Sequence, residues 1–403
     1  MSGPRLFTRN LLAYLGSRFC AASAMTMLRA GVAWHVFALT GSAFHLGMVG
    51  LVQFLPTPAF MLLGGALADT YDRRTIMMTA QSAAMTSALV LGVATWRGAV
   101  TLPLLYAIVV AIAIAGTFDS PSRAALLPTL VPREILPHAV TISSTNQALA
   151  FTTGPALGGL LIAAAGIRAV YVAYAVLVTG SVLGLLVLRP APTPRRDGLT
   201  VRSTVRAIRE GLAFVRGRQV VLGCMVLDMF AVIFGGAAAL LPIYADRILQ
   251  VGPRGYGLLT SSLELGALLS ALVMSVRPPI HRGGRALLAA VGVYGTATVV
   301  FGLSRWFPLS VAAYMLVGVA DQVSVVMRST IIQLATPDEI RGRVSAVNMI
   351  FIGASNQLGA AESGFVAALT SAPFAVVSGG LGCLVVLALV AATMPHLRRY
   401  RVG

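Results

Sequence analysis

The 403-residue sequence contains little charge and no lysine. Asp, Glu, Lys and Arg make up only 11% of it, against about 25% in an ordinary soluble domain. All 30 basic residues are Arg. Without Lys, the chain cannot contain the G-x-x-x-x-G-K-[ST] loop that holds nucleotide phosphates. We infer that this polypeptide does not hydrolyse ATP.

Cysteine is also scarce, and its placement excludes two kinds of site. Cys20, Cys224 and Cys383 lie in separate apolar runs, without C-x-x-C or Cys/His spacing. Neither a disulfide framework nor a zinc site is therefore indicated. The five His residues are scattered without ligand spacing, and no nucleophile or acid/base cluster accompanies them. We expect no metal, no cofactor and no catalytic residue, which argues against a membrane-embedded enzyme.

Long hydrophobic runs occupy most of the chain, which is 57% hydrophobic. Each run is about 20 residues long, the length that a helix needs to cross about 30 Å of hydrocarbon. The sequence therefore predicts an all-α integral membrane protein with twelve transmembrane helices. The predicted spans are 12–38, 46–68, 75–96, 103–126, 140–165, 169–188, 219–245, 257–277, 285–304, 308–332, 343–368 and 373–393.

The Arg residues gather on alternate loops, and this predicts the topology. A formal net charge of +17 would favour nucleic acid in a soluble protein, but here the charge lies between apolar runs and at both ends. The positive-inside rule places such loops in the cytoplasm. We expect a multi-pass protein of a bacterial inner (cytoplasmic) membrane, in contact with the lipid bilayer, with both termini cytoplasmic and no nucleic acid partner. The Arg-rich set comprises Arg5, Arg9, Arg73, Arg74, Arg133, the 189–218 segment, Arg282, Arg285, Arg341, Arg343, Arg398, Arg399 and Arg401.

A polar segment divides the chain near its midpoint, and the two sides repeat each other. Its second part spaces Val205, Ile208, Leu212 and Val215 like an amphipathic helix on a membrane surface. A parallel duplication keeps both halves in one orientation, with a substrate path between them. We expect two six-helix bundles over 1–188 and 219–403, joined by a cytoplasmic linker over 189–218. At a shift of 205 residues, Arg123 matches Arg328, Pro132 matches Pro337, Glu134 matches Glu339, Ile135 matches Ile340, Gly154 matches Gly359 and Gly159 matches Gly364.

The loop after the second span carries a recognisable motif. It reads Gly64-Gly65-Ala66-Leu67-Ala68-Asp69-Thr70-Tyr71-Asp72-Arg73-Arg74 and resembles the signature loop of the major facilitator superfamily, roughly G-x-L-A-D-R-x-G-R-R/K. Thr70 and Asp72 depart from that pattern. Gly65 permits close helix approach, whereas Asp69 at a helix C-terminus needs an outside partner. We predict that Asp69 pairs with the start of the eleventh span, just after Arg341 and Arg343, and that Arg73 and Arg74 belong to the same gate; a solvated turn is the alternative.

The fifth span contains a second motif, which concerns direction of transport. Gly154-Pro155-Ala156-Leu157-Gly158-Gly159 resembles the G-P-x-x-G-G antiporter motif of exporters in this superfamily. Pro155 removes a backbone hydrogen bond, and Gly154, Gly158 and Gly159 permit close packing, so the helix can bend against its neighbours. A packing kink without directional meaning is the alternative.

Two further segments look like one branch of the superfamily, which contains the enterobactin exporter and the macrolide-efflux proteins. They are Phe118-Asp119-Ser120-Pro121-Ser122-Arg123 and Thr336-Pro337-Asp338-Glu339-Ile340-Arg341-Gly342-Arg343. The resemblance covers almost the entire chain. It implies two six-helix bundles related by a pseudo-twofold axis, and it names a branch without naming a substrate.

Charged residues inside the predicted spans are the candidates for proton coupling and transport, because charge in hydrocarbon is costly. Asp119 and Arg123 lie one helical turn apart and can pair, which predicts a gating role shared by Arg328. Asp228 and Asp321 lie near mid-depth of the second half, where protonation could be coupled to rocking of the halves. A structural hydrogen bond to neighbouring polar side chains is the alternative. A pair between Arg29 and Glu264 would face substrate or simply neutralise both charges. The candidates are Arg29, Asp119, Asp228, Glu264, Asp321 and Glu362.

These observations predict a secondary transporter. We expect a monomer that exports a small hydrophobic or amphipathic compound, such as a drug, siderophore or secondary metabolite, by proton antiport. Its partners are then the small-molecule substrate, protons and the lipid bilayer. Sodium coupling stays open, and so does an importer or uniporter on the same fold, because alternating access has no intrinsic direction.

Overall fold

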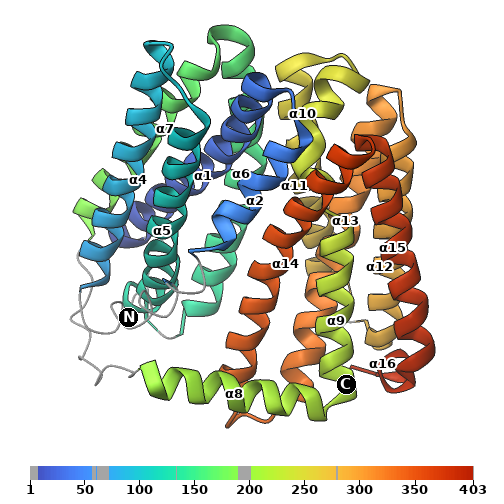
Figure 1. Ribbon diagram of the computed structural model, residues 1–403. Helices are drawn as coiled ribbons and strands as arrows, with labels where there is room; N and C mark the ends of the chain where they lie inside the picture. Colours follow the sequence, from blue (N-terminus) through green and yellow to red (C-terminus); the bar gives the residue numbers. More distant parts are fainter. Residues whose placement is uncertain are drawn as a thin grey trace. The chain divides into compact units, whose positions relative to one another are not determined.

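The computed structural model describes residues 8–56, 60, 72–132, 134–188, 201–277 and 280–402 (Figure 1). All regular elements in this part of the chain are helices. Ten of them are long and apolar enough to cross a membrane. They are α1 (Arg9–Thr40), α4 (Arg73–Trp96), α5 (Leu102–Leu126), α6 (Leu136–Ala165), α7 (Ile167–Val187), α9 (Gln219–Phe234, continued by short turns), α11 (Gly252–Val276), α12 (Gly283–Leu303), α13 (Phe307–Ala335) and α15 (Ala372–Thr393).

Four further described helices lie outside the ten candidate spans, and two of them overlap predicted spans. The shorter apolar helix α2 (Ala43–Phe54) falls in the second predicted span, most of which lies outside the described residues. The eleventh span corresponds to α14 (Arg341–Leu369), which is not among the ten candidate spans. Two helices lie between or after the spans, α8 (Val201–Gly217) and α16 (Pro395–Arg399). Every predicted span overlaps a helix, so the prediction of an all-helical membrane protein is confirmed.

Glycines and capping side chains separate the helices. Gly41, Gly98 and Gly166 have φ of +59°, +67° and +77°, a region that Gly adopts without steric cost. They fall in the breaks after α1, α4 and α6. The hydroxyls of Thr101 and Ser371 accept hydrogen bonds from the amides three residues on, at the starts of α5 and α15. These caps satisfy backbone donors that a helix start leaves unpaired.

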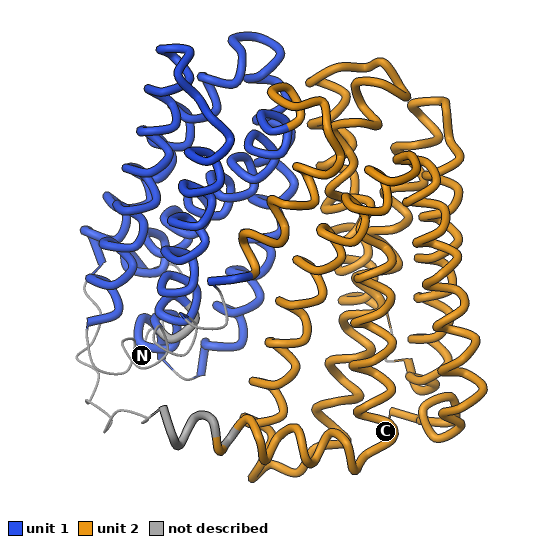
Figure 2. Tube along the Cα trace, in the orientation of Figure 1, with its two compact units in different colours: residues 1–36, 55–201 blue, residues 37–54, 202–403 orange. Residues whose placement is uncertain are grey.

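The chain forms two compact units (Figure 2). Unit 1 comprises residues 1–36 and 55–201, and unit 2 comprises residues 37–54 and 202–403. Residues 37–54 group with unit 2 because α2 packs closely on α14. A Cβ at Gly47 would lie 3.0 Å from the Gly364 Cα, and one at Gly50 would lie 2.8 Å from the Ala360 Cβ. The division at 188 and 219 stays a prediction.

Each unit contains a close helix contact at an equivalent position of the sequence repeat. In unit 1, a Cβ at Gly154 of α6 would lie 2.7 Å from the Ser23 carbonyl oxygen of α1. In unit 2, a Cβ at Gly359 of α14 would lie 2.6 Å from the Val232 carbonyl oxygen of α9. The matched glycines therefore have the same role in both units: each allows the backbones of two helices to come into contact.

The helix α8 packs its apolar side against protein at the lower end of unit 2 in Figure 1. Val215 is 1% exposed, and Ile208 and Leu212 pack against the same hydrophobic core. A Cβ at Gly211 would lie 2.8 Å from the Arg343 carbonyl oxygen. The helix therefore contacts the start of α14 with part of its apolar face. Its place on the membrane surface stays a prediction.

Candidate functional site

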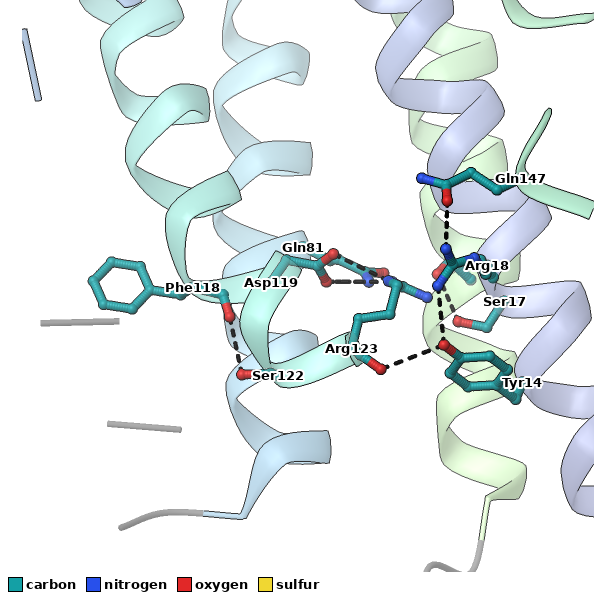
Figure 3. A network of polar contacts seen from close by, with 10 residues as sticks. Tyr14, Ser17, Arg18, Gln81, Phe118, Asp119, Ser122, Arg123 and Gln147 are labelled. Atoms are coloured by element: carbon teal, nitrogen blue, oxygen red, sulfur yellow. Dashed lines mark hydrogen bonds and ion pairs between the residues drawn. The ribbon is translucent and has the colours of Figure 1, made fainter. Parts of the chain in front are cut away.

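Unit 1 contains a network of polar side chains around Asp119 (Figure 3). Asp119 and Arg123 stand four residues apart on α5, so their side chains meet on one face. The Arg123 Nε and Nη2 atoms donate to the two carboxylate oxygens over 3.2 Å each. Gln81 of α4 donates to Asp119 Oδ1 over 2.8 Å. Because Arg123 is only 8% exposed, this is the buried ion pair that the helical spacing predicts.

Arg18 of α1 extends this network, and the sequence analysis overlooked it. Its guanidinium donates to the Tyr14 hydroxyl over 3.0 Å and to the amide oxygen of Gln147 on α6. The Tyr14 hydroxyl in turn donates to the Arg123 carbonyl oxygen over 3.3 Å. The network thus links α1, α4, α5 and α6 (Figure 3). Arg18 lies inside the first predicted span, so the rule that selected Arg29 also finds it.

Unit 2 contains the counterpart of this ion pair, with a different source of negative charge. Arg328 of α13 matches Arg123 in the sequence repeat and pairs with Asp228 of α9. Their exposed fractions are 3% and 7%, so the pair is sequestered from water. Ser324 occupies the position that corresponds to Asp119. The carboxylate therefore comes from a neighbouring helix in unit 2 and from the same helix in unit 1.

Asp321 of α13 differs from Asp228 in having no fixed counter-charge. In the part of the chain that the structure describes, no ion pair joins Asp321 to a basic residue. It is half-buried and lies close enough to Tyr294 and Tyr314 to interact electrostatically with both hydroxyl groups. Glu264 of α11 also interacts with Tyr314. Two acidic residues and two tyrosines from three helices therefore share one region of unit 2.

Two other charged candidates, Glu362 and Arg29, lie on α14 and α1. Glu362 of α14 is half-buried, and the Ser363 hydroxyl donates to its carboxylate over 3.2 Å. Arg29 is exposed on α1. The pairing of Arg29 with Glu264 stays a prediction.

The structure gives several predicted gating residues definite partners. Arg74 donates to the carbonyl oxygens of Leu186 and Leu188 over 2.9 and 3.2 Å, which satisfies carbonyls at the end of α7. Gly65 and Asp69 lie outside the described residues, and so does the predicted meeting of Asp69 with the eleventh span. Arg73 stands in the first turn of α4.

At the start of α14, both Arg residues form ion pairs with described residues of unit 2. Arg341 pairs with Asp338, one turn away, and Arg343 pairs with Glu210 of α8. Both pairs are partly exposed. The described contacts of this predicted gate therefore tie α14 to its own preceding turn and to the linker helix.

The Gly-Pro motif of α6 faces α1. Gly154, Pro155, Gly158 and Gly159 are all buried, and a Cβ at Gly158 would lie 3.2 Å from the Met27 Cγ. The motif therefore forms the contact surface between the two helices. Its directional meaning stays a prediction.

Neither metal ligands nor the apolar grooves define another site. Among the described residues, no three His, Cys, Asp or Glu side chains form a group that could hold a metal ion. A groove of about 310 Å³ lies between α4 and α5, and one of about 590 Å³ lies between α12 and α13. Ala, Gly and aliphatic residues form most of both linings, and none of the charged candidates contributes to them.

Comparison with solved structures identifies the fold. A bacterial homologue of the human lysosomal transporter Spinster, inward-facing and unoccupied, superposes with a TM-score of 0.69 at 15% identity, covering 96% of this chain and 95% of that one. The human organic anion transporter MFSD10 gives a TM-score of 0.64 at 17% identity, covering 95% of this chain and 99% of that one. A POT family transporter in complex with 5-aminolevulinic acid gives a TM-score of 0.73 at 11% identity, covering 98% of this chain and 99% of that one. These similarities establish the twelve-helix fold of major facilitator superfamily transporters.

Sequence comparison then gives the family. Residues 14–400 match the family described as transmembrane secretion effector, and the chain belongs to that family. The enterobactin exporter EntS of Escherichia coli O1:K1 is 27% identical over 396 residues, which cover 96% of this chain and 92% of the relative. The exporter of Escherichia coli O139:H28 is 26% identical over 391 residues, with the same coverage. The chain is thus a multi-pass membrane transporter and not an enzyme.

Proposed function

We propose that this protein exports a small hydrophobic or amphipathic compound from the cytoplasm by proton antiport and alternating access. The observation that carries the proposal is the similarity to enterobactin exporters across 96% of the chain. The Gly-Pro motif of α6 supports the same direction. The absence of Lys supports a gradient as the source of energy, because a nucleotide-binding loop needs that residue.

Asp321 is the coupling residue that the contacts favour. Because no described basic residue pairs with it, gaining a proton removes the cost of a charge in hydrocarbon. Asp228 and Asp119 differ, since each is neutralised by a buried guanidinium. A proton on either of these would leave an Arg unpaired. We therefore assign coupling to Asp321, with Glu264 and Glu362 as further sites, and a structural or gating role to the two ion pairs.

Everted membrane vesicles that contain the protein test both direction and coupling. A panel of hydrophobic and amphipathic compounds is supplied with an imposed pH gradient, with and without a protonophore. We expect gradient-dependent accumulation of at least one compound in everted vesicles and not in right-side-out vesicles. Accumulation of every transported compound only in right-side-out vesicles would indicate an importer.

The variant Asp321→Asn should lose gradient-driven accumulation, because Asn cannot exchange a proton. It should retain equilibration of the compound down its own gradient. The matched control is Asp246→Asn, which removes an exposed carboxylate just beyond the seventh predicted span. Unchanged accumulation in Asp321→Asn would remove this residue from the coupling mechanism.

Alternating access predicts that α2 separates from α14 during transport. The close approach of Gly50 to Ala360 offers a direct test by a disulfide between Gly50→Cys and Ala360→Cys. The Cβ separation of 2.8 Å is about 1 Å below the usual value for a disulfide, so the helices must part slightly. We expect oxidation to stop transport and a reductant to restore it. Full transport by the cross-linked protein would show that this contact need not open.

A further inference from the structure

The segment that follows α15 is fixed against the start of α12. The Val402 amide donates to the His281 carbonyl oxygen over 2.8 Å, and the Gly284 amide donates to the Tyr400 carbonyl oxygen over 3.2 Å. Leu397 is fully buried in the core of unit 2. Residues 280–285 and 395–402 therefore form one connected surface, beside the lower end of α9 in Figure 1.

Basic side chains cover the outer side of this surface. Leu397, Tyr400 and Val402 pack inward, while the basic residues between them are exposed. Neither segment contains Asp or Glu. Across the described residues, no ion pair joins any of the five Arg side chains to a carboxylate. We call this set the basic platform: Arg282, Arg285, Arg398, Arg399 and Arg401, with His281 and His396 beside it.

The basic platform concentrates donors that suit phosphate oxygens. Hydrogen bonds between the two segments hold like charges near one another, and a bound anion relieves that repulsion. A guanidinium presents a planar fork of donors that binds phosphate in a bidentate manner. The start of α12 has no side-chain cap, and helix starts favour anions, although the Gly284 amide already donates to Tyr400.

We propose that the basic platform binds the phosphate-bearing headgroups of anionic phospholipids. It lies at the start of α12 and just beyond the end of α15, which are both candidate membrane spans. Headgroups lie at the ends of such spans, and Arg clusters placed there attract anionic lipid. A bound headgroup would join α12 to the 395–402 segment and fix that end of unit 2. This role does not depend on the transported compound or on its direction.

Native mass spectrometry of the full-length protein in maltoside micelles tests the proposal. Phosphatidylglycerol or phosphatidylcholine with identical acyl chains is titrated against the protein. We expect preferential binding of phosphatidylglycerol. The triple variant Arg398→Gln/Arg399→Gln/Arg401→Gln should weaken that binding about tenfold or more, because each Arg at an anionic surface contributes to it. Phosphatidylcholine binding should not change.

A second triple variant controls for net charge. Arg97→Gln/Arg168→Gln/Arg254→Gln removes the same charge from exposed positions at the opposite helix ends, and it should retain phosphatidylglycerol binding. Glycerol 1-phosphate, added as a soluble competitor, should displace little lipid. Equal losses in both variants, no preference for phosphatidylglycerol in the unmodified protein, or full displacement by the soluble phosphate would each overturn the proposal. Circular dichroism confirms that both variants are folded.

Discussion

Replacing Asp228 by Asn should sharply lower the thermal unfolding temperature, whereas replacing Asp321 by Asn should leave it nearly unchanged. Arg328 is only 3% exposed, so the first variant leaves a buried guanidinium without counter-charge. Removing one partner of a buried ion pair costs about 3–5 kcal/mol. Asp321 has no such pair to lose. Thermal unfolding of both purified variants in one detergent, followed by circular dichroism, measures the difference.

A double variant shows whether charge is the cause. Asp228→Asn combined with Arg328→Gln removes both charges and should recover most of the lost stability, because no unpaired charge remains in the core. Losses that simply add would contradict this explanation and point to side-chain shape. The same comparison at Asp119 and Arg123 should give a smaller effect, because the Asp119 side chain is 22% exposed and water reaches that pair.

The second large loss of stability is expected from Gly359→Ala in α14. Alanine is the better helix former by about 0.8–1 kcal/mol, yet this variant should be less stable. Its Cβ would lie 2.6 Å from the Val232 carbonyl oxygen and 3.1 Å from the Ile233 Cα. The two backbones must therefore move apart, and such overpacking costs about 1–3 kcal/mol. The unfolding temperature and the yield of monodisperse protein measure the loss.

Gly353→Ala, on the same helix, is the matched control. Nothing lies within 4 Å of a Cβ at that position, so this variant should be as stable as the unmodified protein or slightly more stable. Gly154→Ala should repeat the loss in unit 1, where α6 meets α1. Equal stability of the two α14 variants would mean that the close contact with α9 does not limit packing.

Much of the fold could be predicted from the sequence, because a bilayer imposes simple rules of length and polarity. About 20 apolar residues suffice to mark a span, and every predicted span overlaps a helix. The ion pair of Asp119 and Arg123 could also be predicted from the sequence, because one helical turn separates the two residues. The matched positions Gly154 and Gly359 identify the close contacts, because a duplicated sequence keeps its packing positions.

Partners supplied by other helices could not be predicted in this way. The sequence marks Asp228 as a buried acid without indicating Arg328, 100 residues further on. Likewise, Arg74 belongs to a signature loop, yet its guanidinium caps the end of α7. Spacing along the chain shows which face of a helix a residue occupies. It does not show which helix comes to lie beside that face.

The different sources of negative charge in the two ion pairs have a consequence for biogenesis. Asp119 and Arg123 enter the bilayer on one helix and neutralise each other on arrival. Asp228 enters with α9, three spans before α13 brings Arg328, because α11 and α12 lie between them in the chain. Until then, a carboxylate in hydrocarbon costs about 2.5–3.5 kcal/mol on insertion scales. This cost favours a newly made α9 that stays in contact with protein until α13 arrives, so we expect these helices to enter the membrane as a group.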